Sequence, residues 1–491
     1  MNTTVILVSF SLYTLVIVAV GLWSAVYARR SDEDYFLAGR SLGPWVAALS
    51  ASASSESGWV TLGLVGWAFT YGVQAHWIIP GCLLGFLFNW FFIAGRMSRR
   101  SRELGAVTLP DFFAFHFRER TPLLRALSVL VILVAMFLYV SAQFAAAGKA
   151  FEASFPGVDY RVGVLIGAAV VLVYTVTGGF RAVCWTDFLQ ALLMVGTLVI
   201  FPVALLITRG GFGPLGQALG GAEGDLLRFW PAFSPEEGGV AAMIGFLLGS
   251  GALGINLGYP GQPHVLVRFM ALEDPKSARI GGIISAIWAA LIYWGAVTIG
   301  LFARAMAETG VDWTEGMDGE LGLVLSAMHL LPGVLSGLIL AAVLAAICST
   351  ADSQLVVAAS SGANDLYARI VERSTRTSHF LINRLVLLAL GLAAVAMVIN
   401  REVQVYTYVL TYGWAVLGAS FGPQVALALL WRRATYAGCV AGMFTGFAVA
   451  LLWAIPMVGV MVDGVPQTVS LGKSLQISAG IEVYNLTLGF V

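Results

Sequence analysis

Apolar runs of about 20 residues recur along the whole chain, and each is long enough to cross a lipid bilayer as a helix. Charged residues make up only 11% of the chain, whereas soluble domains typically carry about 25%. This pattern predicts an all-α polytopic membrane protein. The predicted spans cover residues 5–27, 44–68, 76–95, 126–150, 162–178, 186–208, 240–259, 280–305, 332–361, 380–399, 404–430 and 436–461.

The charges that flank the first run indicate its orientation. No basic residue precedes the run, but Arg29 and Arg30 follow it, which is the wrong order for a cleaved signal peptide. Because cytoplasmic loops are enriched in Lys and Arg, we predict a first helix whose N-terminus lies outside. A last apolar segment, from Ile481 to Val491, is too short to span, so we expect an incomplete thirteenth helix there.

The composition also argues against several classes of function. The formal net charge is zero, so no nucleic-acid partner is expected. Three of the four cysteines fall within predicted spans, Cys184 lies just before one, and none has the spacing of metal ligands. The five histidines are scattered, and no nucleophile stands beside a candidate base, so we expect neither an enzyme nor a cofactor.

The second span is interrupted by polar and small residues in the stretch SASASSESGW, Ser50–Trp59. Irregular backbone at membrane depth is tolerated where it lines a cavity or is buried in protein. An ionisable residue there, in this case Glu56, indicates a functional site. The alternative is tight helix packing, because small residues let helices approach closely.

The seventh span carries a second interruption, GSGALGINLGYPG, at Gly249–Gly261. Its glycines and Pro260 disfavour a continuous helix. Two interrupted helices five spans apart are typical of inverted-repeat transporters, although two unrelated kinked helices would give the same pattern. We therefore expect a leading helix (1–30), a first five-helix repeat (40–210), a second, inverted repeat (238–432) and trailing helices (433–491).

The ninth span contains the polar sequence CSTADS within an otherwise apolar helix. Ser349 and Thr350 could complete an all-oxygen sodium cage beside the opened backbone of the second span. Alternatively, their hydroxyls bond back to their own helix. Asp352 is predicted to be either a carboxylate on the ion's exit path or a solvated charge at the helix end.

Three further positions have competing interpretations. Asp187, at the inner end of the sixth span, could capture a cation or could neutralise Arg181. Tyr139 lies in the middle of the fourth span, and Tyr259 lies next to the second interruption with Gln262 close behind. Each tyrosine could contact a substrate or could be a packed residue whose hydroxyl is satisfied.

At these residues the chain resembles a known family. The stretches GRSLGPWVAALSASASSESGW, GGFRAVCWTDFLQ, LGYPGQPHVLVRFMA and LAAICSTADSQLVVAASSGANDLY are similar to those of bacterial members of the sodium/solute symporter family. The resemblance covers nearly the whole chain, and GQPHVLVRFMA is most similar to the proline branch. It implies a leucine-transporter-type fold in the bacterial inner membrane, with sodium as the coupling ion and L-proline or a similar small zwitterion as the imported solute.

The resemblance also implies roles for individual residues. For the sodium ion it implies the backbone carbonyls of Ala53, Glu56 and Ala346 and the hydroxyls of Ser349 and Thr350. For the substrate it implies Ser57, Gly58, Trp59, Tyr139, Tyr259, Gln262 and Pro263. Asp187 would lie on the ion path and Arg40 near the inner gate.

The chain departs from the family pattern at two places. Ser55 and Glu56 stand where the family usually has aspartate followed by methionine, and a shift of one residue turns a carboxylate by about 100° around a helix. Ile255 stands where an aromatic residue is expected. These departures leave open a sodium- or proton-coupled carrier of another amino acid or small organic acid, and a transporter-like sensor module is a further alternative.

Overall fold

The computed structural model describes residues 3–25, 32–222, 225–230, 239–249, 251–369, 376–462, 465–474 and 484–491. The end of the predicted leading helix, with Arg29 and Arg30, therefore lies outside the described residues, and so do residue 238 and residues 481–483.

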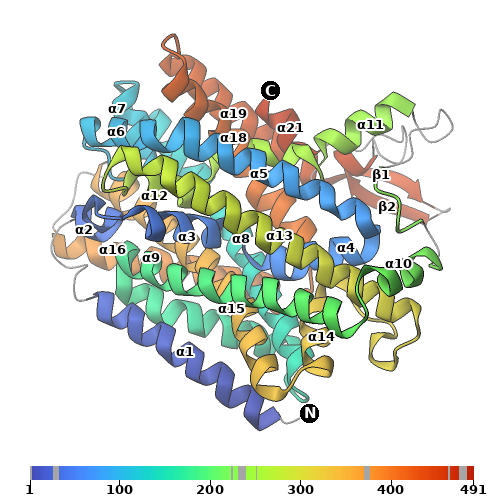
Figure 1. Cartoon of the computed structure of the whole chain (residues 1–491). Helices are drawn as coiled ribbons and strands as arrows, with labels where there is room; N and C mark the ends of the chain where they lie inside the picture. The colour runs from blue at the N-terminus through green and yellow to red at the C-terminus, as the bar shows by residue number, and fades with distance from the viewer. Residues whose placement is uncertain are drawn as a thin grey trace.

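Long helices lie side by side and form a single bundle (Figure 1). They are α1 (Thr3–Ala25), α8 (Leu123–Ser154), α9 (Tyr160–Thr208), α13 (Ala278–Glu308), α15 (Gly333–Ser360), α16 (Arg376–Val398), α18 (Ala415–Leu430) and α19 (Tyr436–Ala454). Helix α15 is central, since it packs against α1, α8, α9 and α16.

Shorter helices cap the bundle or continue its interrupted members. The α-helical ones are α2 (Asp32–Leu37), α3 (Pro44–Ser55), α4 (Val65–Tyr71), α5 (Ile78–Phe88), α6 (Gly95–Leu104), α7 (Leu109–His116), α10 (Phe212–Gly220), α11 (Gly239–Leu248), α12 (Pro263–Met270), α14 (Gly322–Leu330), α17 (Val405–Tyr408) and α21 (Asn485–Phe490). The 3₁₀ segments include η1 (Ala38–Arg40), η3 (Gly72–Trp77), η6 (Leu253–Gly261) and η9 (Gly319–Leu321). Helices α2, α6 and α7 gather at one end of the bundle, and α10 and α14 lie at the other (Figure 1).

Four segments of the described chain are wound as π-helices. They are η2 (Trp59–Leu64), η4 (Asn89–Ala94), η10 (Ser361–Ala368) and η11 (Val409–Trp414). Each of them continues directly into an α-helix at one end or both, and such segments are frequent at functional sites.

Both predicted interruptions are confirmed. Helix α3 ends at Glu56, whose backbone (φ −101°, ψ 78°) is no longer helical, and η2 resumes the span at Trp59. In the seventh span α11 stops at Leu248, and the chain restarts as η6 after Ala252, an irregular residue with φ −140° and ψ −123°. Pro263 then begins α12. The first position of a helix tolerates proline, because an N–H group there has no hydrogen-bond partner within the helix.

Nine stretches of the described chain are long and apolar enough to cross a membrane. The sequence predicted twelve spans, and the difference has a structural cause. The broken seventh span contains no single helix of sufficient length, and the second and third spans join in one stretch, Trp59–Leu104. The fifth and sixth predicted spans both lie in α9, and Gly179 (φ 62°, ψ −175°) kinks this helix between them.

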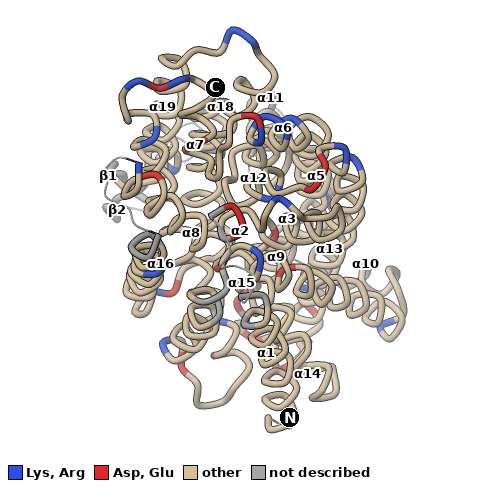
Figure 2. The backbone as a smooth tube through the Cα atoms, turned by 90° about the vertical axis from the view of Figure 1, so that its left-hand side faces the viewer, with Lys and Arg blue, Asp and Glu red and all other residues tan. Residues whose placement is uncertain are grey.

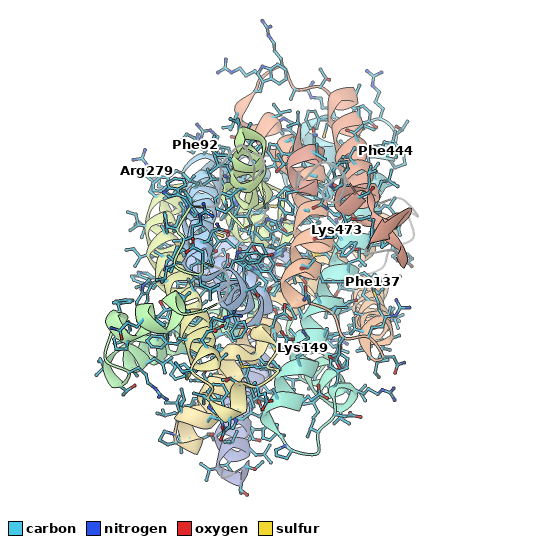
Figure 3. All side chains as sticks on the ribbon, turned by 90° about the vertical axis from the view of Figure 1, so that its right-hand side faces the viewer. Phe92, Phe137, Lys149, Arg279, Phe444 and Lys473 are labelled. Atoms are coloured by element: carbon cyan, nitrogen blue, oxygen red, sulfur yellow. The ribbon has the colours of Figure 1, made fainter. Side chains whose placement is uncertain are left out.

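The outer surface of the bundle fits a lipid environment. Large apolar side chains point outward, including Phe92 (51% exposed) and Phe444 (58% exposed), both labelled in Figure 3. Lys and Arg residues lie mostly near helix ends and in connecting segments (Figure 2). The protein is therefore a multi-pass membrane protein.

The end of the twelfth span was predicted wrongly. The span was expected to reach residue 461, but α19 ends at Ala454. Pro456 follows, and the chain forms an antiparallel hairpin of β1 (Pro456–Val462) and β2 (Val465–Ser470). Proline restrains the residue before it from helical geometry, and the valine-rich run that follows favours a strand. The short helix α21 packs on α18 and α19.

Candidate functional site

Hydroxyls of α15 meet backbone carbonyls of α3 where α3 ends. The Ser349 hydroxyl lies 2.9 Å from the carbonyl oxygen of Ala53 and 3.1 Å from that of Ala346. The Thr350 hydroxyl donates to the carbonyl of Ser54 at 3.0 Å and lies 3.5 Å from that of Ala53. These neutral oxygens form what we call the oxygen cluster, and opened backbone beside hydroxyls suits a small hard cation such as sodium.

The oxygen cluster contains most of the predicted sodium ligands. Ala53, Ala346, Ser349 and Thr350 come together as the sequence predicted. The carbonyl of Ser54 joins them and was not predicted. Ligation by the backbone carbonyl of Glu56 stays a prediction, and the side chain of this residue points toward Tyr259 of η6.

Gln143 of α8 holds the irregular backbone between α3 and η2. Its side-chain oxygen accepts the N–H of Gly58 at 3.1 Å, and its amide nitrogen donates to the Ser57 hydroxyl at 3.2 Å. A Cβ atom added at Gly58 would lie 3.1 Å from Ala146 and 3.2 Å from Ile347, so glycine is needed for this close approach. Three of the predicted substrate residues therefore lie at this break, since Trp59 follows directly.

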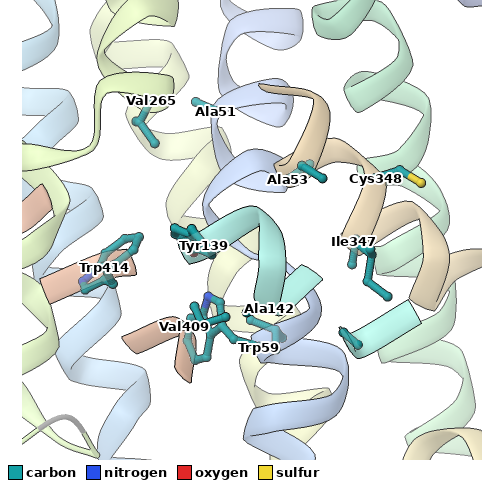
Figure 4. Packing of buried hydrophobic residues seen from close by; sticks show 14 of the residues in the cluster. Ala51, Ala53, Trp59, Tyr139, Ala142, Val265, Ile347, Cys348, Val409 and Trp414 are labelled. Atoms are coloured by element: carbon teal, nitrogen blue, oxygen red, sulfur yellow. The ribbon is translucent and has the colours of Figure 1, made fainter. Parts of the chain in front are cut away.

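Aromatic side chains surround the break (Figure 4). Tyr139 is fully buried, and its hydroxyl has no hydrogen-bond partner among the described residues. The rings of Tyr259 and Trp414 meet edge to face, with centroids 4.6 Å apart. The indole N–H of Trp59 donates to the carbonyl of Ser55 at 3.1 Å, which fixes this ring against the break.

Gln262 and Pro263 lie at the junction of η6 and α12. The amide nitrogen of Gln262 donates to the carbonyls of Gly258 (3.0 Å) and Trp414 (3.1 Å), so it ties η6 to η11. Its side-chain oxygen is buried and has no partner in the described structure. Pro263 is the first residue of α12, and a contact of either residue with substrate stays a prediction.

Glu56 is fully buried beside two tyrosines. One carboxylate oxygen, Oε1, accepts the hydroxyl of Tyr259 at 3.1 Å, and this hydroxyl lies 2.9 Å from that of Tyr293 on α13. The other oxygen, Oε2, has no hydrogen-bond partner among the described residues. Tyr293 was missed by the sequence reasoning, because a lone tyrosine in an apolar span gives no signal beyond packing.

Asp187 forms an ion pair with Arg268 across the centre of the bundle. Both side chains are fully buried, and Nη2 of Arg268 lies 2.7 Å from Oδ2 of Asp187. The hydroxyls of Ser50 (2.7 Å) and Ser54 (3.1 Å) donate to the same oxygen, and Arg268 also donates to Ser353 at 2.6 Å. The pair therefore joins α3, α9, α12 and α15.

This ion pair corrects two expectations from the sequence. Arg181, the alternative partner of Asp187, lies 3.6 Å from Asp34 instead. The predicted spans end at residue 259 and resume at residue 280, which leaves Arg268 outside them, but α12 (Pro263–Met270) buries this residue. The sequence feature that could have revealed the burial of Arg268 is its position in the apolar run VLVRFM. Such a run after the interruption indicates a further buried helix that contains the arginine.

The environment of Asp352 excludes one of its two interpretations. The residue lies within α15 and is fully buried, so it is not a solvated charge at a helix end. Its carboxylate lies 3.2 Å from the hydroxyl of Ser353, which also contacts Arg268. A role on the ion path stays a prediction.

Arg40 ties together the two interrupted helices at one end of the bundle. It pairs with Glu33, and its guanidinium donates to the carbonyls of Ala106 (2.7 Å) and Met270 (3.1 Å). Backbone hydrogen bonds of Leu42 with the chain after α12 close the same end. Because Arg40 is only 8% exposed and contacts four segments, its position fits the predicted gate.

At the opposite end, the carboxylate of Glu320 joins α8, η9 and α17. It accepts the ammonium of Lys149 at 2.7 Å and the N–H groups of Val405 (3.0 Å) and Tyr406 (2.9 Å). The ring of Tyr406 stacks on Trp67, with centroids 4.6 Å apart. Lys149, labelled in Figure 3, is only 6% exposed.

We expect Glu320→Gln to lower the free energy of unfolding by about 2 kcal/mol, because two charge-assisted hydrogen bonds weaken and Lys149 keeps only Asp318 as partner. Thermal unfolding of the purified protein in detergent measures the loss. Glu308→Gln is a matched control, since it removes a pair with Arg304 that is about one quarter exposed, and it should cost less than about 1 kcal/mol. Equal melting temperatures for the two variants would contradict the prediction.

Known proteins are similar to this chain over most of its length. Residues 35–446 match the profile described as "Sodium:solute symporter family". The sodium/proline symporter of Escherichia coli strain K12 is 35% identical over 455 residues, which cover 92% of this chain and 88% of that protein. The high-affinity proline transporter PutP of Bacillus subtilis strain 168 is 37% identical over 434 residues, covering 87% and 88%.

A solved structure shows the same fold. A sodium-coupled sialic acid symporter in a substrate-bound outward-open state aligns with a TM-score of 0.76 at 18% identity, covering 99% of this chain and 95% of that chain. The likeness confirms the predicted all-α, leucine-transporter-type membrane bundle.

Proposed function

Because the chain belongs to the sodium:solute symporter family, we propose that it imports L-proline or a similar small zwitterion together with sodium, by alternating access. The observation that carries this proposal is the oxygen cluster beside the break in α3. The proline-transporting relatives support the choice of solute. The family consists of transporters, so the chain is a secondary transporter rather than an enzyme.

In this proposal sodium binds in the oxygen cluster, with Ser349 and Thr350 as its side-chain ligands. The solute binds next to it, at the break between α3 and η2, against Trp59, Tyr139 and Tyr259. Because the break is one structural unit, an ion that orders the end of α3 also orders the backbone that faces the solute. This shared element couples the two binding events.

In this proposal the solute and the ion reach the site past the two ends of the bundle, one held together by Arg40 and the other by Lys149 with Glu320. We assign the Arg40 end to the cytoplasm and the Lys149 end to the outside, which places the N-terminus outside the inner membrane and follows the charge distribution. Asp187, whose Oδ1 has no partner in the described structure, would receive sodium on its way to the cytoplasm. The repeats 40–210 and 238–432 would then be the two halves that move.

Reconstitution into proteoliposomes tests the proposal. An inward sodium gradient should drive accumulation of radiolabelled L-proline, and a sodium ionophore should abolish it. Counterflow with a panel of amino acids and small carboxylic acids then ranks the solutes. Accumulation driven equally well by a proton gradient in choline medium would refute sodium coupling, and counterflow by carboxylic acids alone would refute a zwitterionic solute.

A further inference from the structure

Glu56 is a buried carboxyl group that lacks a positively charged partner among the described residues. The carboxylate is fully buried and forms no ion pair within the described ranges. The hydroxyl of Tyr259 donates to Oε1 at 3.1 Å, and Oε2 has no hydrogen-bond partner among the described residues. Removing a carboxylate from water is costly unless a cation or a full set of hydrogen bonds compensates it. A cation that bound beside Glu56 would therefore stabilise the ionised form of this carboxyl group.

The backbone at the C-terminal end of α3 also favours a cation near Glu56. Glu56 caps the C-terminal end of α3, with its own N–H bonded to the carbonyl of Ser52. The carbonyl end of a helix carries a partial negative charge, which favours a cation. The C-terminal end of α3 therefore favours a cation beside Glu56 independently of the carboxyl group.

The groups around the carboxylate indicate the kind of cation. Besides the carboxylate, the oxygens placed beside it are the hydroxyls of Tyr259 and Tyr293, which are too few to replace the water shell of a metal ion. Aromatic rings make up much of the remaining wall. The ring centroid of Tyr259 lies 4.9 Å from that of Phe86 and 4.6 Å from that of Trp414. The ring centroids of Tyr293 and Trp59 are 6.0 Å apart. Aromatic faces attract organic ammonium groups, which are weakly hydrated.

We propose that Glu56, with the aromatic side chains of Tyr259, Tyr293, Trp59 and Trp414, binds the cationic nitrogen of the transported solute. The inference rests on the proposed function and deepens it, since it makes Glu56 the residue that selects solutes with a positively charged amine. The carboxylate of such a solute would then lie toward the break, where the buried hydroxyl of Tyr139 has no partner in the described structure.

The arrangement also explains why the carboxylate of Glu56 and the oxygen cluster do not compete. The oxygen cluster consists of neutral oxygens that face α15, whereas the Glu56 side chain faces η6 and α13. Two cations of different chemistry, a metal ion and an ammonium group, can therefore occupy opposite sides of one broken helix.

Two probes of similar shape, one with a ring ammonium and one with a neutral ring oxygen, test the proposal. L-Proline carries a ring ammonium, and (S)-tetrahydrofuran-2-carboxylate has an uncharged oxygen at that position. Their inhibition constants against labelled proline uptake are measured in saturating sodium. We expect the wild type to prefer proline by at least about 30-fold, and Glu56→Gln to reduce this ratio to about threefold, mainly through weaker proline binding.

The outcomes separate the possible errors. No sodium-dependent uptake of proline or of any other zwitterion in the counterflow panel refutes the proposed function itself. If the wild type takes up proline and prefers it about 30-fold over the oxygen analogue, and Glu56→Gln leaves this ratio of inhibition constants unchanged, only the role of Glu56 is refuted. If Glu56→Gln fails to fold, the wild type decides alone, since equal binding of the two probes overturns the inference. Glu308→Gln, which neutralises a partly exposed carboxylate outside this site, should keep the discrimination of about 30-fold.

Discussion

Arg268→Met should stop transport and lower the free energy of unfolding by about 3–5 kcal/mol, because it leaves the carboxylate of Asp187 buried without its cation. Ser50 and Ser54 would remain as donors, but two hydroxyls do not replace a guanidinium. Thermal unfolding in detergent and uptake in proteoliposomes measure the two effects. Arg279→Met removes an exposed arginine on α13 and should change stability by less than about 0.5 kcal/mol.

A double variant separates stability from transport. Arg268→Met with Asp187→Leu replaces the whole ion pair by apolar groups, which is often neutral for stability. We expect this variant to regain most of the melting temperature but no uptake, because a sodium ion leaving the site would lose its carboxylate. Asp187→Asn alone should also slow turnover. Uptake at the wild-type rate in either variant would leave Asp187 only a structural role as the partner of Arg268.

The Ser349→Ala/Thr350→Ala variant should raise the sodium concentration for half-maximal uptake by roughly 10- to 100-fold. The two hydroxyls are the side-chain ligands of the oxygen cluster, and each lost oxygen contact is worth about 1 kcal/mol. At saturating sodium the affinity for L-proline should change less than about threefold, because the proposed solute site is built from other side chains. Sodium titration of uptake, with and without excess proline, measures both values.

Ser360→Ala provides the matched control for this pair. Ser360 lies on the same helix, but its hydroxyl donates to the carbonyl of Val356 within α15. Its loss should leave the sodium dependence unchanged. A double variant with wild-type sodium dependence would show that the oxygen cluster is a packing contact between α3 and α15.

Local composition predicted the main features of this architecture. The serines, Gly58 and Glu56 of the second span could not sit in a lipid-facing helix, and Pro260 with its glycines could not continue one. Ser349 and Thr350 were found because hydroxyls are conspicuous in an apolar helix. The family resemblance then indicated that these hydroxyls meet Ala53, a pairing across the sequence that no local pattern contains.

The remaining site residues could not be predicted, because their partners lie far away in the sequence. Gln143 contacts Gly58, and Tyr293 joins Tyr259, only through the packing of separate helices. The burial of Arg268 depends on α12, which restarts after a break that looked like the end of a span. The strand after Ala454 was missed, because a short apolar run has the same composition in a helix and in a strand.

The four π-helical segments give the bundle a mechanical property. A π turn holds one residue more than an α turn, and this surplus can pass to the neighbouring turn as the hydrogen bonds exchange partners. Each such step turns the affected residues by about 100° and advances them by about 1.5 Å. The segments η2 and η11 carry Trp59 and Trp414. A one-residue shift of the π turn in η2 or η11 would therefore rotate the indole of Trp59 or Trp414 toward or away from the centre of the bundle. The ends of each helix would keep their positions during this shift.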